Sequence, residues 1–232
     1  MKQSLLSGQL GPLRLKNPVL AASGTFGYAQ EFAAFYDVAR LGGIVTKTIT
    51  LRPRAGNPAP RIVDTPAGML NAIGLQNVGV EAFLQHKLPY LAQLDTVIIV
   101  SIMATSTAEL AELGARLDLP GVDALELNLS CPNVSYADAA ASAVMFAPRP
   151  KADGRGSQRG ARVHRQASHS QARPGRTVDR RIGRAACDAG ADALAVMNTI
   201  PGMVIHAATG AGKPQRWALW AGDPLGGGTP RL

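Results

Sequence analysis

Residues 124–134 read Ala-Leu-Glu-Leu-Asn-Leu-Ser-Cys-Pro-Asn-Val, and the rest of the fold is built outward from this stretch. Leucines alternate with Glu126 and Asn128, and this period of two predicts a strand with two different faces. The polar residues 130–133 should end the strand, because a proline in their midst restricts the backbone. Cys131 is therefore expected just past a strand end, where α/β barrels place their catalytic groups.

The chemistry of Cys131 is open at this point: a base, a nucleophile, a metal ligand or a small buried apolar residue. A metal site is not expected, since Cys187 is the only other cysteine and no Cys/His pair has ligand spacing. The carboxamides of Asn128 and Asn133 on either side favour a functional site, because a packed core rarely holds so many amides.

The composition fits one sizeable core. The chain has 232 residues, of which 46% are hydrophobic, whereas a full (β/α)8 barrel takes about 250. No apolar run is long enough to span a membrane, and the N-terminus does not read as a signal peptide. Two cysteines give no disulfide framework, so we expect a cytoplasmic protein without a membrane partner.

The net charge of +8 is localised in one segment. Residues 149–184 contain ten Arg and one Lys against two Asp, a net charge of +9, which leaves the remainder at −1. A basic face on a folded domain is therefore not indicated, and a nucleic-acid partner is not expected.

Apolar runs and helical spacing alternate along the chain, which predicts an α/β fold with a parallel sheet. Strands are expected at 17–23, 42–48, 95–101, 124–129 and 193–198, after a short entry strand or hairpin arm at 10–15. Helices are expected at 26–40, 80–94 (with His86 on its surface), 106–117 (capped by Ser106 or Thr107) and up to Gly190, and a long loop at 51–79.

Five segments at the expected strand ends and in the long loop carry a family resemblance. They are Ala22-Ser23-Gly24, Thr46-Lys47-Thr48, Asn-Ala-Ile-Gly-Leu at 71–75, Asn-Leu-Ser-Cys-Pro-Asn at 128–133, and Asn-Thr-Ile-Pro-Gly-Met at 198–203. In this order they resemble the dihydroorotate dehydrogenases, in particular class 1, whose catalytic base is a cysteine, and within it the B-type catalytic subunit. Taken singly, each segment could also be structural, as an ordinary turn, a solvated lysine or an asparagine turn.

The resemblance implies a (β/α)8 TIM barrel that binds FMN and oxidises dihydroorotate to orotate in de novo pyrimidine (UMP) biosynthesis. Cys131, as thiolate, would take the proton from C5 of dihydroorotate while hydride leaves C6 for N5 of FMN. The implied substrate-binding residues are Lys47, Asn71, Ala72, Ile73, Gly74, Leu75, Asn128, Asn133, Asn198 and Thr199. The implied cofactor-binding residues are Ala22, Ser23, Gly24, Lys47, Thr48, Ser101, Asn128 and Met197.

The B-type resemblance also implies partners: an FAD and iron–sulfur electron-transfer subunit that uses NAD, and a homodimeric core. Two other functions remain open from the sequence. One is a dihydropyrimidine dehydrogenase-like flavin barrel with the same cysteine chemistry, and the other is a non-catalytic fragment or basic binding protein.

Residues 137–184 and 206–232 depart from the family pattern within what we expect to be one barrel domain over 1–232. Between 149 and 184 only Val163, Val178 and Ile182 are large and apolar, so an irregular conformation is expected. Out-of-frame translation would explain the abrupt change and the return of the pattern at Ala185. The barrel would then be truncated, with a scrambled fifth strand and without its seventh and eighth.

Overall fold

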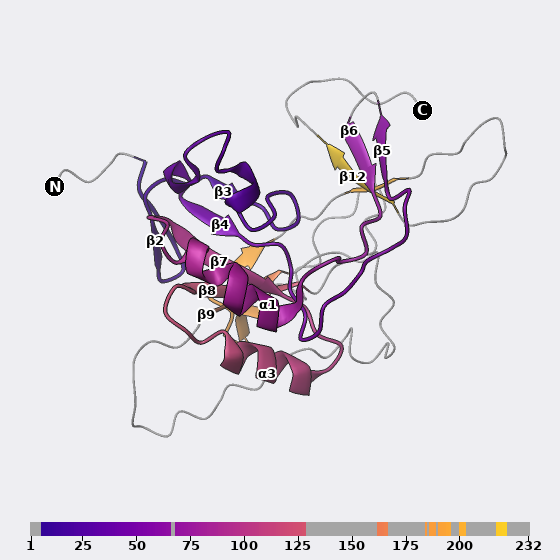
Figure 1. Ribbon diagram of the computed structural model, residues 1–232. Helices are drawn as coiled ribbons and strands as arrows, with labels where there is room; N and C mark the ends of the chain where they lie inside the picture. Colours follow the sequence, from indigo (N-terminus) through magenta and orange to yellow (C-terminus); the bar gives the residue numbers. More distant parts are fainter. Residues whose placement is uncertain are drawn as a thin grey trace, which may run out of the picture.

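A six-stranded parallel sheet forms the centre of the fold (Figure 1). The computed structural model describes residues 6–65, 68–128, 162–166, 184, 186–188, 190–195, 200–202 and 217–221. The strands lie in the order β10-β9-β8-β7-β4-β3, and each neighbouring pair is parallel. Their bounds are Leu20–Ala21 (β3), Gly43–Val45 (β4), Val97–Ile102 (β7), Ala124–Asn128 (β8), Arg162–Gln166 (β9) and Leu194–Ala195 (β10).

Apolar side chains on both faces of this sheet are packed against other parts of the chain, as expected for apolar parallel strands. One face packs against helices α1 (Gly79–His86), α2 (Leu88–Leu91) and α3 (Thr107–Arg116), and α1 and α3 lie on the same side of the sheet in Figure 1. The apolar residues of that layer include Ile44, Ile98, Val100, Ile102, Leu125 and Leu127 from the strands and Val80, Phe83, Leu88, Leu91, Leu110 and Leu113 from the helices. The predicted α/β class with a parallel sheet is therefore confirmed.

The other face begins with a small apolar layer. Val45, Ile99 and Ala124 pack together on three adjacent strands, against Leu10 and Leu13. The latter two belong to an antiparallel hairpin, β1 (Gly8–Leu10) and β2 (Leu13–Leu15). The expected entry hairpin is thus present, and it covers the sheet at the level where the strands begin.

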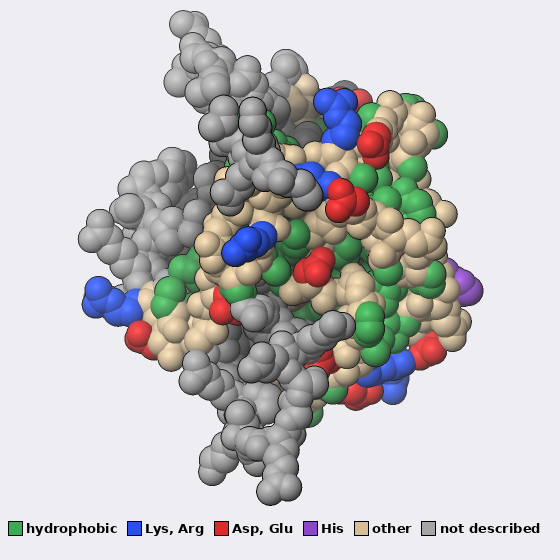
Figure 2. Space-filling view, turned by 90° about the vertical axis from the view of Figure 1, so that its left-hand side faces the viewer, with side chains coloured by type: hydrophobic (Ala, Val, Ile, Leu, Met, Phe, Trp, Pro, Cys, Tyr) green, Lys and Arg blue, Asp and Glu red, His purple; other side chains and the backbone are tan. Residues whose placement is uncertain are grey.

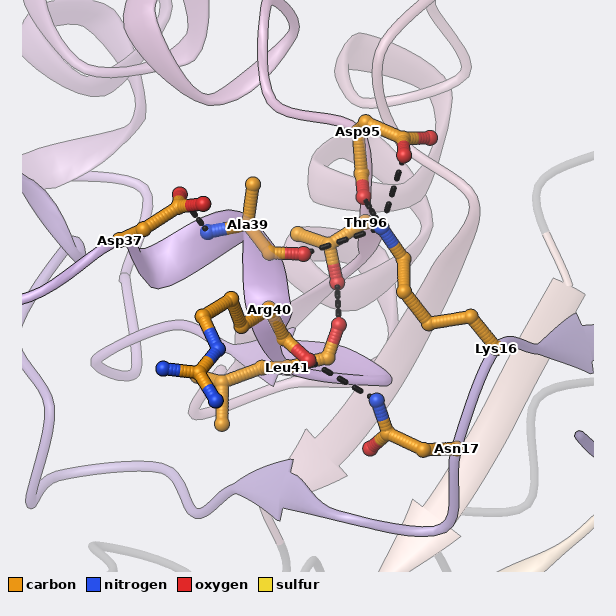
Figure 3. Close-up of polar contacts among 8 residues, drawn as sticks. All are labelled: Lys16, Asn17, Asp37, Ala39, Arg40, Leu41, Asp95 and Thr96. Carbon is orange, nitrogen blue, oxygen red and sulfur yellow. Dashed lines mark hydrogen bonds and ion pairs between the residues drawn. The ribbon is translucent and has the colours of Figure 1, made fainter. Parts of the chain in front are cut away.

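Polar contacts tie the segments that precede these strands (Figure 3). The Lys16 ammonium donates to the backbone carbonyl of Ala39 at 3.0 Å, to the backbone carbonyl of Asp95, and to the Asp95 carboxylate at 2.8 Å. The Thr96 hydroxyl donates to the carbonyl of Leu41 at 2.7 Å. These bonds join the chain after β2 to the segments that enter β4 and β7.

The capping of α3 agrees with the sequence. Ser106 is the N-cap, and its hydroxyl accepts from the backbone N–H of Glu109 at 3.2 Å. Glu109 in turn accepts from the backbone N–H of Thr105 at 2.9 Å, so each side chain satisfies an N–H that the helix itself cannot.

Two helical predictions need correction. Residues 26–40 form two 3₁₀ turns, η1 (Gln30–Phe32) and η2 (Val38–Arg40), because Gly27 and Ala29 adopt positive φ angles of 55° and 66° that no α-helix contains. The helix expected over 80–94 is divided into α1 and α2 at Lys87, next to Pro89, which has no N–H to donate. His86 is exposed, as expected.

The loop expected over 51–79 contains a hairpin. Strands β5 (Ile62–Thr65) and β6 (Gly68–Asn71) are antiparallel, and the second sheet has the order β11-β12-β6-β5. Its other members are β11 (Ile200–Gly202) and β12 (Trp217–Ala221), which come from much later in the chain. The hairpin stands apart from the parallel sheet in Figure 1.

Two short strands, β9 and β12, fall within the segments 137–184 and 206–232, most of which lie outside the described residues. β9 occupies the fifth position of the parallel sheet and pairs with β8 from Ala124↔Arg162 to Asn128↔Gln166. Strand pairing uses backbone groups, so a free strand edge can be paired by a segment whose side chains are polar.

The face of the molecule in Figure 2 shows no concentration of one charge among the described residues. On the face in Figure 2, acidic and basic side chains of the described residues alternate with apolar ones. Among the helices of the described segments, none combines the length and the hydropathy needed to cross a bilayer.

Candidate functional site

Four polar side chains meet where the parallel strands end. The Asn128 side-chain amide donates to the Thr48 hydroxyl at 2.9 Å. The Thr48 hydroxyl also lies 2.9 Å from the Ser101 hydroxyl and 3.3 Å from that of Ser23. We call Ser23, Thr48, Ser101 and Asn128 the strand-end cluster.

The topology explains why these four residues meet. Ser23 and Thr48 follow β3 and β4, Ser101 lies near the end of β7, and Asn128 ends β8. These are adjacent parallel strands, so their carboxyl ends lie at one edge of the sheet, where α/β proteins bind ligands. Thr48, Ser101 and Asn128 are buried, at 3%, 0% and 8% exposure, which makes their mutual hydrogen bonds worth more than on the surface.

Glu126 and Thr46 lie beneath this cluster. The Thr46 hydroxyl accepts from the backbone N–H of Ser101 at 3.2 Å. Burial raises the pKa of Glu126 to about 7, and a hydrogen bond with the Ser101 side chain partly offsets this rise. Glu126 is only 7% exposed, and its Oε1 has no hydrogen-bond partner among the described residues.

Lys47 provides a half-buried cation beside the cluster. Its backbone N–H donates to the carbonyl of Gly27 at 2.8 Å, which fixes the chain just after β4. Burial lowers the pKa of Lys47, as does the nearby Arg61, while Glu31 acts in the opposite direction. A partly desolvated ammonium of this kind favours an anionic ligand.

The segment 71–75 is held by hydrogen bonds with Asn57 and Arg61. Ala72 donates its N–H to the carbonyl of Arg61 at 2.8 Å, and its own carbonyl accepts from the Asn57 side chain at 2.7 Å. Gly74 has φ +73°, and a side chain there would meet Asn57 at 2.7 Å. Arg61, which accepts the bond from Ala72, is also close enough to Lys47 for its positive charge to lower the pKa of Lys47.

The remaining predicted residues of 71–75 differ in their exposure. Asn71 ends β6 and is half-buried, as are Ile73 and Leu75. Leu75 has a positive φ of 57°, a conformation that is strained for a residue with a side chain. This strain accompanies a tight turn over Asn77, whose amide donates to the Leu75 carbonyl at 2.8 Å.

The turn after β3 leaves open space. The carbonyl of Ala22 accepts from the hydroxyl of Thr25 at 2.9 Å, which closes the turn around Ser23 and Gly24. Gly24 has φ +83°, and a Cβ there would meet nothing within 4 Å. The position therefore needs glycine for its conformation, and the space beside it is available to a ligand.

Five predicted site residues lie outside the described residues, namely Cys131, Asn133, Met197, Asn198 and Thr199. The other cysteine, Cys187, is free and exposed. Within the described segments, no group of three His, Cys, Asp or Glu side chains is arranged to hold a metal ion.

Sequence reasoning missed Thr46 and Glu126 as members of the site. Alternating polar residues in a strand usually indicate a solvent-facing side, so Glu126 gave no signal of burial. The available signal was its spacing of two from Asn128, which places both side chains on one face of β8.

Comparison with known proteins gives a consistent family. The family model described as Dihydroorotate dehydrogenase matches residues 5–147. A relative from Pelobacter propionicus, named dihydroorotate dehydrogenase B (NAD(+)), catalytic subunit, is 46% identical over 197 residues, which is 84% of this chain and 63% of the relative.

Two further relatives carry the same name. The protein from Geotalea daltonii is 45% identical over 204 residues, covering 86% of this chain and 64% of its own length. The protein from Desulforudis audaxviator is 48% identical over 194 residues, covering 83% of this chain and 62% of its own length. The chain therefore spans less than two thirds of the length of these relatives. With a family model that matches more than half of its residues, the chain belongs to the dihydroorotate dehydrogenase family.

Proposed function

We propose that this chain carries out the flavin-dependent oxidation of dihydroorotate to orotate, a step of de novo pyrimidine (UMP) biosynthesis. The observation that carries the proposal is the strand-end cluster, which joins four polar side chains from four adjacent strands in a member of this family. The name of these relatives, dihydroorotate dehydrogenase B (NAD(+)), catalytic subunit, supports the same activity.

The residues at the strand ends suit FMN. Hydroxyl and amide groups of the cluster can donate to or accept from the polar edge of a flat heterocycle. The space beside Gly24 admits such a ring close to the backbone, and the Lys47 ammonium favours negative charge on it. When bound, FMN would supply the acceptor for the hydride that leaves dihydroorotate.

The protein's own chemistry is the removal and control of one proton. Cys131, as thiolate, would take the proton from C5 of dihydroorotate, for which a thiol needs a pKa brought toward neutrality. Asn71, Asn133, Asn198 and Thr199, with the backbone of 72–75, would orient the pyrimidine ring. Lys47 would hold the substrate carboxylate, and Asn128 would serve both ligands.

The fold and assembly complete the proposal. The parallel sheet would be part of a (β/α)8 barrel domain over 1–232 that lacks its seventh and eighth strands. The partner would be an electron-transfer subunit with FAD and an iron–sulfur cluster that passes electrons to NAD, around a homodimeric core in the cytoplasm. The term "catalytic subunit" in the relatives' names is the support for such a partner.

Anaerobic reduction of the flavin tests the proposed activity. The purified chain is loaded with FMN, and the flavin absorbance is followed after dihydroorotate is added. We expect bleaching in the wild type and a loss on the order of 10²–10⁴-fold in rate for Cys131→Ala at neutral pH, because a general base contributes about that much. Cys131→Ser should retain a slow rate that rises with pH.

Cys187→Ala is the matched control, since Cys187 is exposed and should not alter the rate. Dihydrouracil in place of dihydroorotate separates this function from a dihydropyrimidine dehydrogenase-like one. Bleaching by dihydrouracil alone, or an unchanged rate in Cys131→Ala, would contradict the proposal.

A further inference from the structure

Glu126 is a buried carboxyl group that the proposed reaction does not use. Along β8 it lies two residues after Ala124 and two before Asn128, so the three share one face. Ala124 packs with Val45 and Ile99 on that face, and Asn128 bonds Thr48. Glu126 therefore lies between the apolar layer at the start of the strands and the cluster at their ends.

The strand register places Glu126 beside Ser101, where a chain of hydrogen bonds through the cluster begins. Ser101 is the register partner of Glu126 on β7, so the two side chains share one face of the sheet, and the Ser101 hydroxyl is one of the groups that hold the pKa of Glu126 down. The Ser101 hydroxyl lies 2.9 Å from that of Thr48, which accepts from the Asn128 amide at 2.9 Å. Ser23 stands at the far end, 3.3 Å from Thr48.

The directions of these bonds depend on one another, because each hydroxyl has a single hydrogen to donate. An ionised Glu126 can only accept, so Ser101 must donate to it, and Thr48 then donates to Ser101. A protonated Glu126 can donate to Ser101. The Ser101 hydroxyl can then donate its hydrogen to the Thr48 hydroxyl. The Thr48 hydroxyl can in turn donate to Ser23 or to a ligand.

We propose that Glu126 is a positioning residue whose proton sets the direction of the Ser101–Thr48–Ser23 hydroxyl chain. It thereby decides which atoms donate at the strand ends. The proton is exchanged with water, and no bond of the substrate is made or broken in this step. The effect on a bound flavin rests on the proposed function, whereas the coupling of Glu126 to Asn128 does not.

Neither ion pair recorded among the described residues involves Glu126. Its register partner on β7 carries the neutral hydroxyl of Ser101, and its Oε1 is unpartnered among the described residues. The charged or titratable residues that pair in register with this face of β8 are Arg162 and His164 on β9, and Lys47 follows β4, one strand beyond β7. Burial, together with the raised pKa that burial causes, puts the proton of Glu126 within reach of ordinary changes in pH.

Nuclear magnetic resonance of the flavin-free chain tests the coupling. With carboxyl-¹³C glutamate we expect one side-chain resonance to titrate near pH 7. It should disappear in Glu126→Gln and stay in Glu112→Gln, a control on the exposed side of α3. Ser101→Ala should raise its midpoint, because the Ser101 hydrogen bond holds the pKa of Glu126 down.

The side-chain amide of Asn128 reports the other end of the chain. In ¹⁵N-labelled protein its resonances should shift with the same midpoint as the glutamate carboxyl. Thr48→Val should abolish that shift and leave the carboxyl titration in place, a result that a merely structural role for Glu126 would not give. His164→Gln should keep both the carboxyl titration of Glu126 and the shift of the Asn128 amide resonances.

The proposal fails if no glutamate carboxyl resonance titrates near neutral pH, or if the Asn128 amide resonances do not shift with the same midpoint as that of Glu126. It also fails if the Asn128 shift persists in Glu126→Gln and is lost in His164→Gln, because His164 would then be its cause. If Glu126→Gln does not fold, Ser101→Ala and Thr48→Val still decide between these results. In the FMN-loaded chain, the flavin absorbance should shift with the same midpoint. Failure to bind FMN, with the Asn128 coupling intact, would refute the proposed function and the effect on flavin, and leave the coupling standing.

Discussion

The burial of Glu126 makes the stability of the protein depend on pH in an unusual direction. Its pKa is about 7 in the folded chain and 4.5 as the ordinary value, so the folded state holds the proton more tightly. As pH rises from 4.5 to about 7, the unfolded chain loses the proton first, and the folded state loses stability relative to it.

We therefore expect Glu126→Gln to gain stability relative to the wild type across this interval, by on the order of 3 kcal/mol, since each pKa unit corresponds to about 1.4 kcal/mol. Urea unfolding of both proteins at pH 4.5 and at pH 8 gives the difference in their free energies of unfolding at each pH, and this difference should grow between the two pH values. Glu112→Gln, at an exposed position, is the control. A difference that does not change with pH would show that Glu126 titrates normally.

Lys47 carries a second prediction for a single residue. Removal of its charge should weaken the retention of FMN and slow its reduction by dihydroorotate, because one cation would serve both ligands. Lys47→Met keeps most of the aliphatic stem and isolates the charge from the packing. Because burial and Arg61 lower the pKa of Lys47, the wild-type affinity for FMN should also fall as pH rises, at a lower pH than for an ordinary lysine.

Equilibrium dialysis with FMN as a function of pH gives the affinity, and Lys47→Arg, which stays charged, should lose this pH dependence. If Lys47→Met binds and is reduced like the wild type, Lys47 is a solvated lysine without a role in the site.

The secondary-structure elements were predictable where the chain carries its own local signals. The strand at 124–128 follows from leucine alternation, and α3 follows from Ser106 and Glu109 at its start. The helix predicted over residues 26–40 was wrong, because their aromatic residues have helical spacing but the positive φ angles at Gly27 and Ala29 prevent an α-helix. The pairing of β6 with β12 was out of reach, because its partners are about 150 residues apart and no local pattern encodes the pairing.

The cap of α3 can be tested directly. Ser106→Ala should destabilise the protein by about 1 kcal/mol, because the N–H of Glu109 loses its acceptor. The sequence left Ser106 and Thr107 as alternatives, and the structure assigns the cap to Ser106. Thr107→Ala is thus the matched control, and its free energy of unfolding in urea should change by less than about half as much. Equal losses in the two variants would contradict the assignment.

At the scale of the whole molecule, the site was predictable to the extent that the family motifs mark strand ends. Parallel strands in chain order bring Ser23, Thr48, Ser101 and Asn128 to one edge, so residues 105 positions apart in the sequence become neighbours. What these motifs could not give is the layer beneath the cluster. The burial of Glu126 depends on what covers the inner face of the sheet, which is a property of the assembled fold.

The segments 137–184 and 206–232 lead to the last prediction, which concerns the coding sequence. A strand in the middle of a parallel sheet is normally a run of apolar residues, yet β9 reads Arg-Val-His-Arg-Gln. The surrounding residues 149–184 carry a net charge of +9 with three large apolar side chains. We expect resequencing of the DNA to reveal frame changes near 137, 184 and 206, and the corrected frame to encode an apolar fifth strand.

A protein made in the corrected frame should bind FMN more tightly than the chain as written, because barrels of this kind commonly bind phosphate at the loops after strands seven and eight. Titration of both proteins with FMN, followed by flavin fluorescence, compares the affinities. If the DNA confirms the frame as written and that chain binds one FMN tightly, the out-of-frame interpretation and the expected defect are both wrong. The phosphate would then have to be held by residues of this chain other than those the family pattern implies.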